Sequence, residues 1–123
     1  MQSLSLNIEG FSYAERDGLL FHLATTIHEC GGWVFHRKPL SPTTMEVHLE
    51  IQPRSAIDLY AALVASGLEL TRNSHLALTA LCTCRRHSAG STEMGRIVSI
   101  CLEICFLEDM TLQSLLMTGS ALA

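Results

Sequence analysis

Four stretches of the chain alternate apolar and polar or small residues, and a period of two is typical of strands that bury one face. In the clearest stretch, every second residue from Met45 to Ile51 is apolar, while Glu46, His48 and Glu50 occupy the other side. The four predicted strands are Leu4–Glu9, Thr44–Ile51, Leu76–Cys84 and Arg96–Leu107. A shorter strand is predicted from Trp33 onward, and it ends at Pro39 because proline cannot donate to a strand ladder.

Two other stretches repeat apolar residues at spacings of three and four, which predicts amphipathic helices. The first begins at Gly18, and Gly31-Gly32 ends it because glycine adopts a left-handed C-terminal cap. The second covers Ala56–Ser66, follows a candidate N-cap at Ser55, and ends at Gly67. The predicted apolar stripes are Leu19, Leu20, Leu23, Ile27 and Cys30 on the first helix, and Ile57, Tyr60, Leu63 and Val64 on the second.

The order of these elements predicts an α+β protein with a ferredoxin-like βαββαβ pattern. Right-handed crossovers place two helices on one face of an antiparallel sheet and leave the other face bare. Residues 1–108 form a single domain, in which Arg96–Leu107 is an added C-terminal strand that could lie at a sheet edge. Residues 109–123 form a C-terminal tail with a short helix.

Composition excludes several classes of partner. The formal net charge is -4 and the pI is about 5.8, so no basic surface for nucleic acid is expected. No apolar run is long enough to span a membrane, and no secretory signal is visible at the N-terminus. The cysteine count is odd, at five, in a chain with enough apolar residues for its own core. We therefore expect a cytoplasmic protein with reduced thiols, no membrane partner and no cofactor.

The first helix and its surroundings resemble the opening signature of the ACT domain, a small regulatory module attached to many enzymes of amino-acid metabolism. The matching residues are Asp17, Gly18, Leu19 and Leu20, then Leu23, Ile27, Gly31 and Gly32, then Trp33 and Val34. The resemblance covers roughly Ser3–Cys84. It departs from the family at Asp17, where many members carry proline, and in the added strand.

This resemblance implies a non-enzymatic regulatory module that works as a homo-oligomer, at least a dimer, and binds a small ligand such as an amino acid. Carried over to this chain, the ligand-binding residues are Gly10, Phe11, Asp17 and Gly18. Glycine lets a ligand approach the backbone, and free amides at a helix N-terminus suit a carboxylate.

An alternative site lies on the bare face of the sheet, where period two gathers histidine and glutamate. Its residues are His36, Glu46, His48, Glu50 and Glu103, and the added strand also offers Cys101. These side chains are chemically competent for a divalent metal. A half-buried strand has polar residues on its outer side in any case, so no metal is assigned from the sequence.

Three hypotheses of function follow. The first is the ACT-like binding module. The second is an enzyme of the dimeric α+β barrel type, which uses the open sheet face as a pocket with His36 or His48 as the base. The third is a purely structural protein-interaction module. Cys82 and Cys84 are interpreted as core residues, because a single intervening residue does not suit a zinc knuckle.

Overall fold

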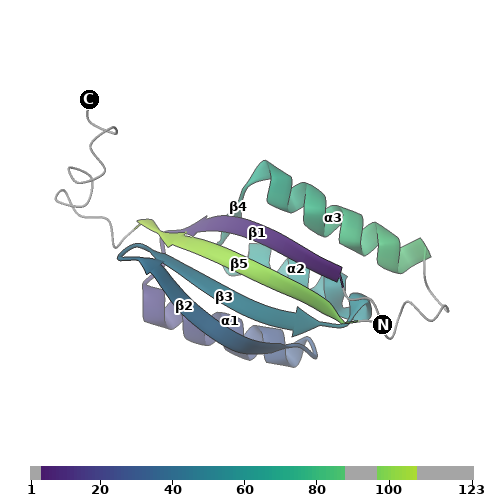
Figure 1. Cartoon of the computed structure of the whole chain (residues 1–123), viewed down its shortest axis with the longest axis horizontal. Helices are drawn as coiled ribbons and strands as arrows, with labels where there is room; N and C mark the ends of the chain where they lie inside the picture. Colours follow the sequence, from purple (N-terminus) through teal and green to yellow (C-terminus); the bar gives the residue numbers. More distant parts are fainter. Residues whose placement is uncertain (1–3, 88–96, 108–123) are drawn as a thin grey trace.

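The computed structural model describes residues 4–87 and 97–107 of the chain, which form a five-stranded mixed sheet with three α-helices (Figure 1). The predicted α+β class is confirmed. The elements are β1 (Leu4–Ser12), α1 (Arg16–Glu29), β2 (Trp33–Ser41), β3 (Thr44–Ile51), the 3₁₀ turn η1 (Pro53–Ser55), α2 (Ala56–Ala65), β4 (Glu69–Leu70), α3 (Arg72–His87) and β5 (Val98–Phe106). The predicted tail, residues 109–123, lies outside the described residues, as does the loop predicted over 88–95.

The strand order is β2-β3-β5-β1-β4, so β5 lies between β3 and β1. It pairs antiparallel with β3 and parallel with β1, and it is drawn as the yellow-green strand at the middle of the sheet in Figure 1. The prediction of a purely antiparallel sheet is therefore wrong, because the added strand joins β1 in the parallel direction. The added strand itself is confirmed, but it occupies the centre of the sheet and not an edge.

The hydrophobic core lies between one face of this sheet and the helices. The inward residues of β5 are at most 2 % exposed, which fits a strand whose whole inner side is covered. Buried and half-buried residues alternate along β5 and along most of β3, which confirms the two-sided pattern predicted there. The core residues contributed by β3 and β5 are Val47, Leu49, Ile51, Val98, Ile100, Leu102, Ile104 and Phe106.

Helix α1 begins and ends as local sequence dictates. The Glu15 carboxylate accepts a hydrogen bond from the backbone N–H of Gly18 at 2.9 Å and so caps the N-terminus. At the other end, Gly31 has φ of +90°, and the N–H of Gly32 donates to the carbonyl of Ile27. A Cβ at Gly32 would lie 2.6 Å from the Ile51 side chain. Glycine there lets the end of α1 pack directly on β3.

The strand predicted over Leu76–Cys84 is wrong, because these residues belong to α3. Thr71 starts the helix: its hydroxyl oxygen accepts from the N–H of Ser74 at 3.2 Å. Leu78 and Leu81 are buried beside Ser74, while Leu76 is 58 % exposed. The buried spacing is therefore four and three, and the apparent period of two came from alanine and threonine, which do not decide which side is buried.

Three smaller corrections concern β2, α2 and the strand before α3. Strand β2 continues through Pro39 to Ser41, since proline is tolerated in an edge strand. Helix α2 turns Ile57 and Val64 outward and buries Leu59, so its apolar stripe is rotated from the predicted one. In place of the fourth predicted strand, the two-residue strand β4 pairs with β1 at the edge of the sheet.

Candidate functional site

The sheet face opposite the helices carries rows of polar residues that run across the strands. In the row through His48, His36 of β2 lies on one side and Cys101 of β5 on the other. In the next row, Glu46 lies between Lys38 and Glu103. Strand pairing thus brings the predicted histidine and glutamate residues of three strands onto one surface.

A β-bulge in β2 decides which of its residues reach this open face. The pairing shifts between Val34 and His36, so Val34 packs toward the core while His36 lies beside His48. Without the bulge, period two would place Val34 and His36 on the same face. Trp33 and Phe35, whose apolar side chains suit a core, are instead 43 % and 54 % exposed. A bulge cannot be recognised from period two alone.

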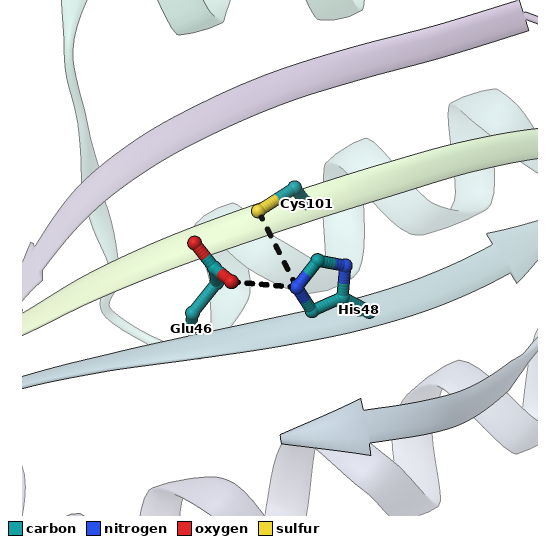
Figure 2. Close-up of side chains that lie close together, drawn as sticks. All are labelled: Glu46, His48 and Cys101. Carbon is teal, nitrogen blue, oxygen red and sulfur yellow. Dashed lines mark hydrogen bonds and ion pairs between the residues drawn. The ribbon is translucent and has the colours of Figure 1, made fainter. Parts of the chain in front are cut away.

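Three side chains on the open face converge on one point (Figure 2). His48 Nε2 lies 2.7 Å from Glu46 Oε1 and 3.9 Å from Cys101 Sγ. One ligand atom from each of the three residues lies within 4.8 Å of the others. We call Glu46, His48 and Cys101 the sheet-face cluster. All three are half-buried, and their two strands are held by the core beneath them.

Hydrogen bonding within the cluster shifts two pKa values in opposite directions. The hydrogen bond from His48 is the main cause that lowers the pKa of Glu46. The pKa of Cys101 is raised to about 11, first by burial, then by the charge of Glu46 and a hydrogen bond to it, and also by the charge of Glu103. At neutral pH the cluster therefore holds a carboxylate that accepts hydrogen bonds from an imidazole and a thiol.

This arrangement does not suit a nucleophilic cysteine. A cysteine nucleophile needs a lowered pKa, and that of Cys101 is raised. A catalytic relay also needs the base to use one ring nitrogen for the nucleophile and the other for the carboxylate. Here Glu46 and Cys101 both lie against the same atom, Nε2 of His48. Three donor atoms this close together are instead chemically competent to hold a metal ion.

The other predicted residues of the open face lie around this cluster. The rings of His36 and Phe35 are tilted against the ring of His48, with centroids 5.4 and 5.9 Å away. Glu50 accepts a hydrogen bond from Ser99 at 3.4 Å, one row away from the cluster. Glu103 lines a separate hollow of about 180 Å³.

The residues assigned from the ACT resemblance line two separate hollows, with Gly10 and Phe11 at one and Asp17 at the other. Gly10 is buried against β4, where an added Cβ would lie 3.0 Å from Leu68. Phe11 lies on the open face beside the hollow that Glu103 lines. The N–H of Gly18 is already bonded by the side chain of Glu15. Asp17 alone of the four lines a cleft of larger size, which lies between α1 and β2.

This cleft, which we call the α1–β2 cleft, has a volume of about 420 Å³. Its lining is mostly apolar, with one acidic and one basic side chain, Asp17 and Arg37. Within the described residues, no ion pair joins these two side chains. The apolar lining residues are Leu20, Phe21, Leu23, Ala24, Val34 and Val47.

Sequence reasoning missed two of these positions. Arg37 was not assigned because the bulge before it reverses the side on which the following residues lie. Cys101 was noted as a contributor but left out of the predicted site, because its contact with His48 depends on the pairing of β3 with β5. The alternation of residues within a strand does not show which distant strand it pairs with.

Comparison of the chain with protein-family models, curated proteins and solved structures found no match. Its own residues therefore carry what can be inferred about function. Among the helices within residues 4–87 and 97–107, none combines the length and the apolar character needed to cross a bilayer.

Proposed function

We propose that the protein is a non-enzymatic, ACT-like module of ferredoxin-like type that binds a small amino-acid ligand in the α1–β2 cleft and works as a homo-oligomer. The observation that carries the proposal is the cleft itself, which combines an apolar lining with Asp17 and Arg37. Its volume of about 420 Å³ falls within the usual range for small-molecule sites.

The chemistry of the lining matches a zwitterion with an apolar side chain. Asp17 is suited to the α-ammonium group, and Arg37 can hold the α-carboxylate with two parallel hydrogen bonds. Neither is neutralised by the other, so a ligand with both charges would satisfy both. Leu20, Val34 and Val47 would bury the side chain of the ligand. We expect aliphatic or aromatic amino acids to bind in preference to polar ones.

Oligomerisation is supported by the edge strand beside this cleft. Every residue of β2 except Val34 is exposed, and Trp33, Phe35 and Leu40 are large apolar residues among them. An exposed edge of this length is a template for pairing with another chain. Pairing of β2 with a second copy would place that copy beside Arg37, so binding and assembly would be linked.

The test of ligand binding is calorimetric titration of the twenty amino acids with matched charge variants. Arg37→Gln should weaken binding about tenfold or more, because a charged hydrogen bond is lost. Lys38→Gln is its control, because it removes a positive charge from the opposite side of the same strand. Asp17→Asn has a similar control in Asp58→Asn, as each acidic residue lies in the first turn of its helix.

A variant that fills the cleft without changing charge completes the test. Ala24→Trp should abolish binding, while Ala61→Trp, at an exposed position on α2, should not. Light scattering after size exclusion gives the assembly state, and Leu40→Glu should produce a monomer where Leu76→Glu on α3 does not. Failure of every amino acid to bind, or binding that Ala24→Trp leaves unchanged, would overturn the proposed ligand site.

A further inference from the structure

The sheet-face cluster lies on the side of the sheet away from the α1–β2 cleft and takes no part in the proposed ligand binding. Its donor atoms are one carboxylate oxygen, one imidazole nitrogen and one sulfur. Zinc in proteins takes this kind of ligand, usually with tetrahedral geometry. We propose that Glu46, His48 and Cys101 bind a divalent metal ion of the zinc class, with a fourth position open to solvent or an exogenous ligand.

The distances are close to those that such an ion requires. Tetrahedral ligands with zinc bonds of about 2.0–2.3 Å lie roughly 3.3–3.6 Å from one another. His48 Nε2 is 3.9 Å from Cys101 Sγ and 2.7 Å from Glu46 Oε1. The donor atoms of Glu46 and Cys101 lie within 4.8 Å of each other, so side-chain movements of about 1 Å would bring all three donors around one ion. No movement of β3 or β5 is needed.

The charges around the cluster favour a cation. Glu103 lies directly opposite Glu46 in the pairing of β3 with β5, and Glu9 lies on the other side of Glu103. Like charges directly opposite each other on a sheet are unfavourable. Lys38 faces this row from the exposed edge strand. A divalent ion would offset the repulsion between the two glutamates at the centre of the sheet.

The mixed donor set determines the class of metal. Magnesium and calcium prefer oxygen ligands only, so a site with a thiol and an imidazole disfavours both. A metal ion takes the lone pair of a ring nitrogen, so binding at Nε2 replaces the contact between His48 Nε2 and Glu46. The Cys101 thiol releases its proton to solvent as the sulfur–metal bond forms, so zinc binding should strengthen as pH rises.

Rigid surroundings support the same assignment. Beneath the cluster, Leu49, Ile100 and Leu102 are at most 2 % exposed, which holds the backbones of both strands in place. On the edge side, the rings of Phe35 and His36 flank the imidazole of His48. A ligand set that is already positioned loses less conformational freedom when the metal binds.

The test uses the full chain, stripped with a chelator and kept reduced. Competition with a chromophoric chelator measures zinc affinity, and cobalt replaces zinc to reveal ligand type by absorption. One equivalent of cobalt should give a thiolate charge-transfer band together with the visible bands of a tetrahedral ion. Cys101→Ser should remove the charge-transfer band and weaken zinc binding at least tenfold, and His48→Gln and Glu46→Gln should weaken it similarly.

Matched variants exclude general effects on the sheet. Cys105→Ser changes the next cysteine on the same side of β5, and Glu50→Gln changes the next glutamate on the same side of β3. Both should retain wild-type affinity. If wild-type protein binds no zinc at micromolar concentration, or if the thiolate band survives in Cys101→Ser, the proposed site is wrong. The second result would assign the metal to another cysteine.

A measurement on the unmodified chain covers the case in which a variant fails to fold. Zinc should slow the alkylation of Cys101 below its rate in the folded metal-free protein, read peptide by peptide by mass spectrometry, while the rate at Cys105 stays unchanged. Equal alkylation of Cys101 with and without zinc would overturn the proposal. Arg37→Gln should leave zinc affinity unchanged, so failure of the amino-acid site and failure of the metal site are distinguished.

Discussion

The two sides of β5 differ in what they contribute, although they alternate along the same nine residues. The inward side is at most 2 % exposed throughout and forms the centre of the core. The outward side is half-buried and carries Ser99, Cys101, Glu103 and Cys105. Burial of apolar area stabilises the first side, whereas the second gains little from burial and carries thiol and carboxyl groups that can titrate. One strand therefore supplies stability on one side and chemistry on the other.

Position in the sheet strengthens this contrast. Because β5 lies between β3 and β1, its backbone is bonded on both sides, and its outward residues have neighbours from both flanking strands. Cys101 lies opposite His48, and Glu103 lies between Glu46 and Glu9. At an edge, the same residues would have had neighbours on one side only. The central position is what places outward residues of both β3 and β1 beside those of β5.

The largest expected effect is a difference in unfolding free energy between substitutions on the two sides of β5. Leu102→Ala should lower the free energy of unfolding by about 2–5 kcal/mol, because it leaves a cavity in a fully buried position. Cys101→Ala, one residue away, should change it by less than about 1 kcal/mol, since the side chain is partly exposed. Urea denaturation of both variants measures the difference. Equal losses would mean that the outward side is as important for packing as the core.

The chemical character of the outward side can be tested through the reactivity of Cys101. Its raised pKa, about 11, keeps the thiol protonated in the folded state at pH 8, where an ordinary cysteine is partly ionised. Alkylation of Cys101 should therefore be roughly tenfold or more slower in the folded protein than in urea, and should accelerate as pH rises toward 11. Peptide-resolved mass spectrometry measures both rates.

A variant shows how much of this protection is electrostatic. Glu46→Gln removes the charge that repels the thiolate, but burial, the largest cause, remains. Only part of the protection should therefore be lost. A folded rate for the wild type equal to the unfolded rate would contradict the raised pKa.

Period two was sufficient to predict which residues of β3 and β5 face outward, because both strands are covered on one side by helices. It failed at Leu76–Cys84, where alanine and threonine occupied the alternate positions and leucines at helical spacing were the buried ones. The signal that identifies the helix is its start, where Thr71 and Ser74 form hydrogen bonds with each other and with the backbone. The hydrogen bonds at the start of α3 therefore indicate a helix where the alternation of residues was ambiguous.

The candidate site was predicted in its residue types but not in its geometry. Outward histidine and glutamate on β3 followed from the sequence, and His36 was placed beside them for a partly wrong reason, since the bulge was not foreseen. The contact of Cys101 with His48 depends on a pairing across 53 residues of chain. The entropy of closing such a loop and the burial of both strands decide that pairing together, and neither is a local property.

The smallest expected effect concerns the repulsion between the two glutamates that face each other across β3 and β5. Glu103→Gln removes one charge from opposite Glu46 and should raise the free energy of unfolding by about 0.2–1 kcal/mol in metal-free protein. The gain should shrink in high salt, because screening already weakens the repulsion there. Glu50→Gln is the control, since Glu50 lies opposite Ser99 and accepts its hydrogen bond.

Zinc should reverse the sign of the effect of Glu103→Gln. A bound ion is attracted by the Glu103 carboxylate, so the wild type should gain more stability from saturating zinc than the variant does. Urea titrations of wild type and variant, with and without zinc and at low and high salt, give the difference in unfolding free energy under each of the four conditions. Destabilisation of the metal-free protein by Glu103→Gln would mean that the two carboxylates already share a proton or a cation. An advantage for the variant that persists in zinc would place the ion away from Glu46. The open side of β5 would then differ from its buried side in polarity alone.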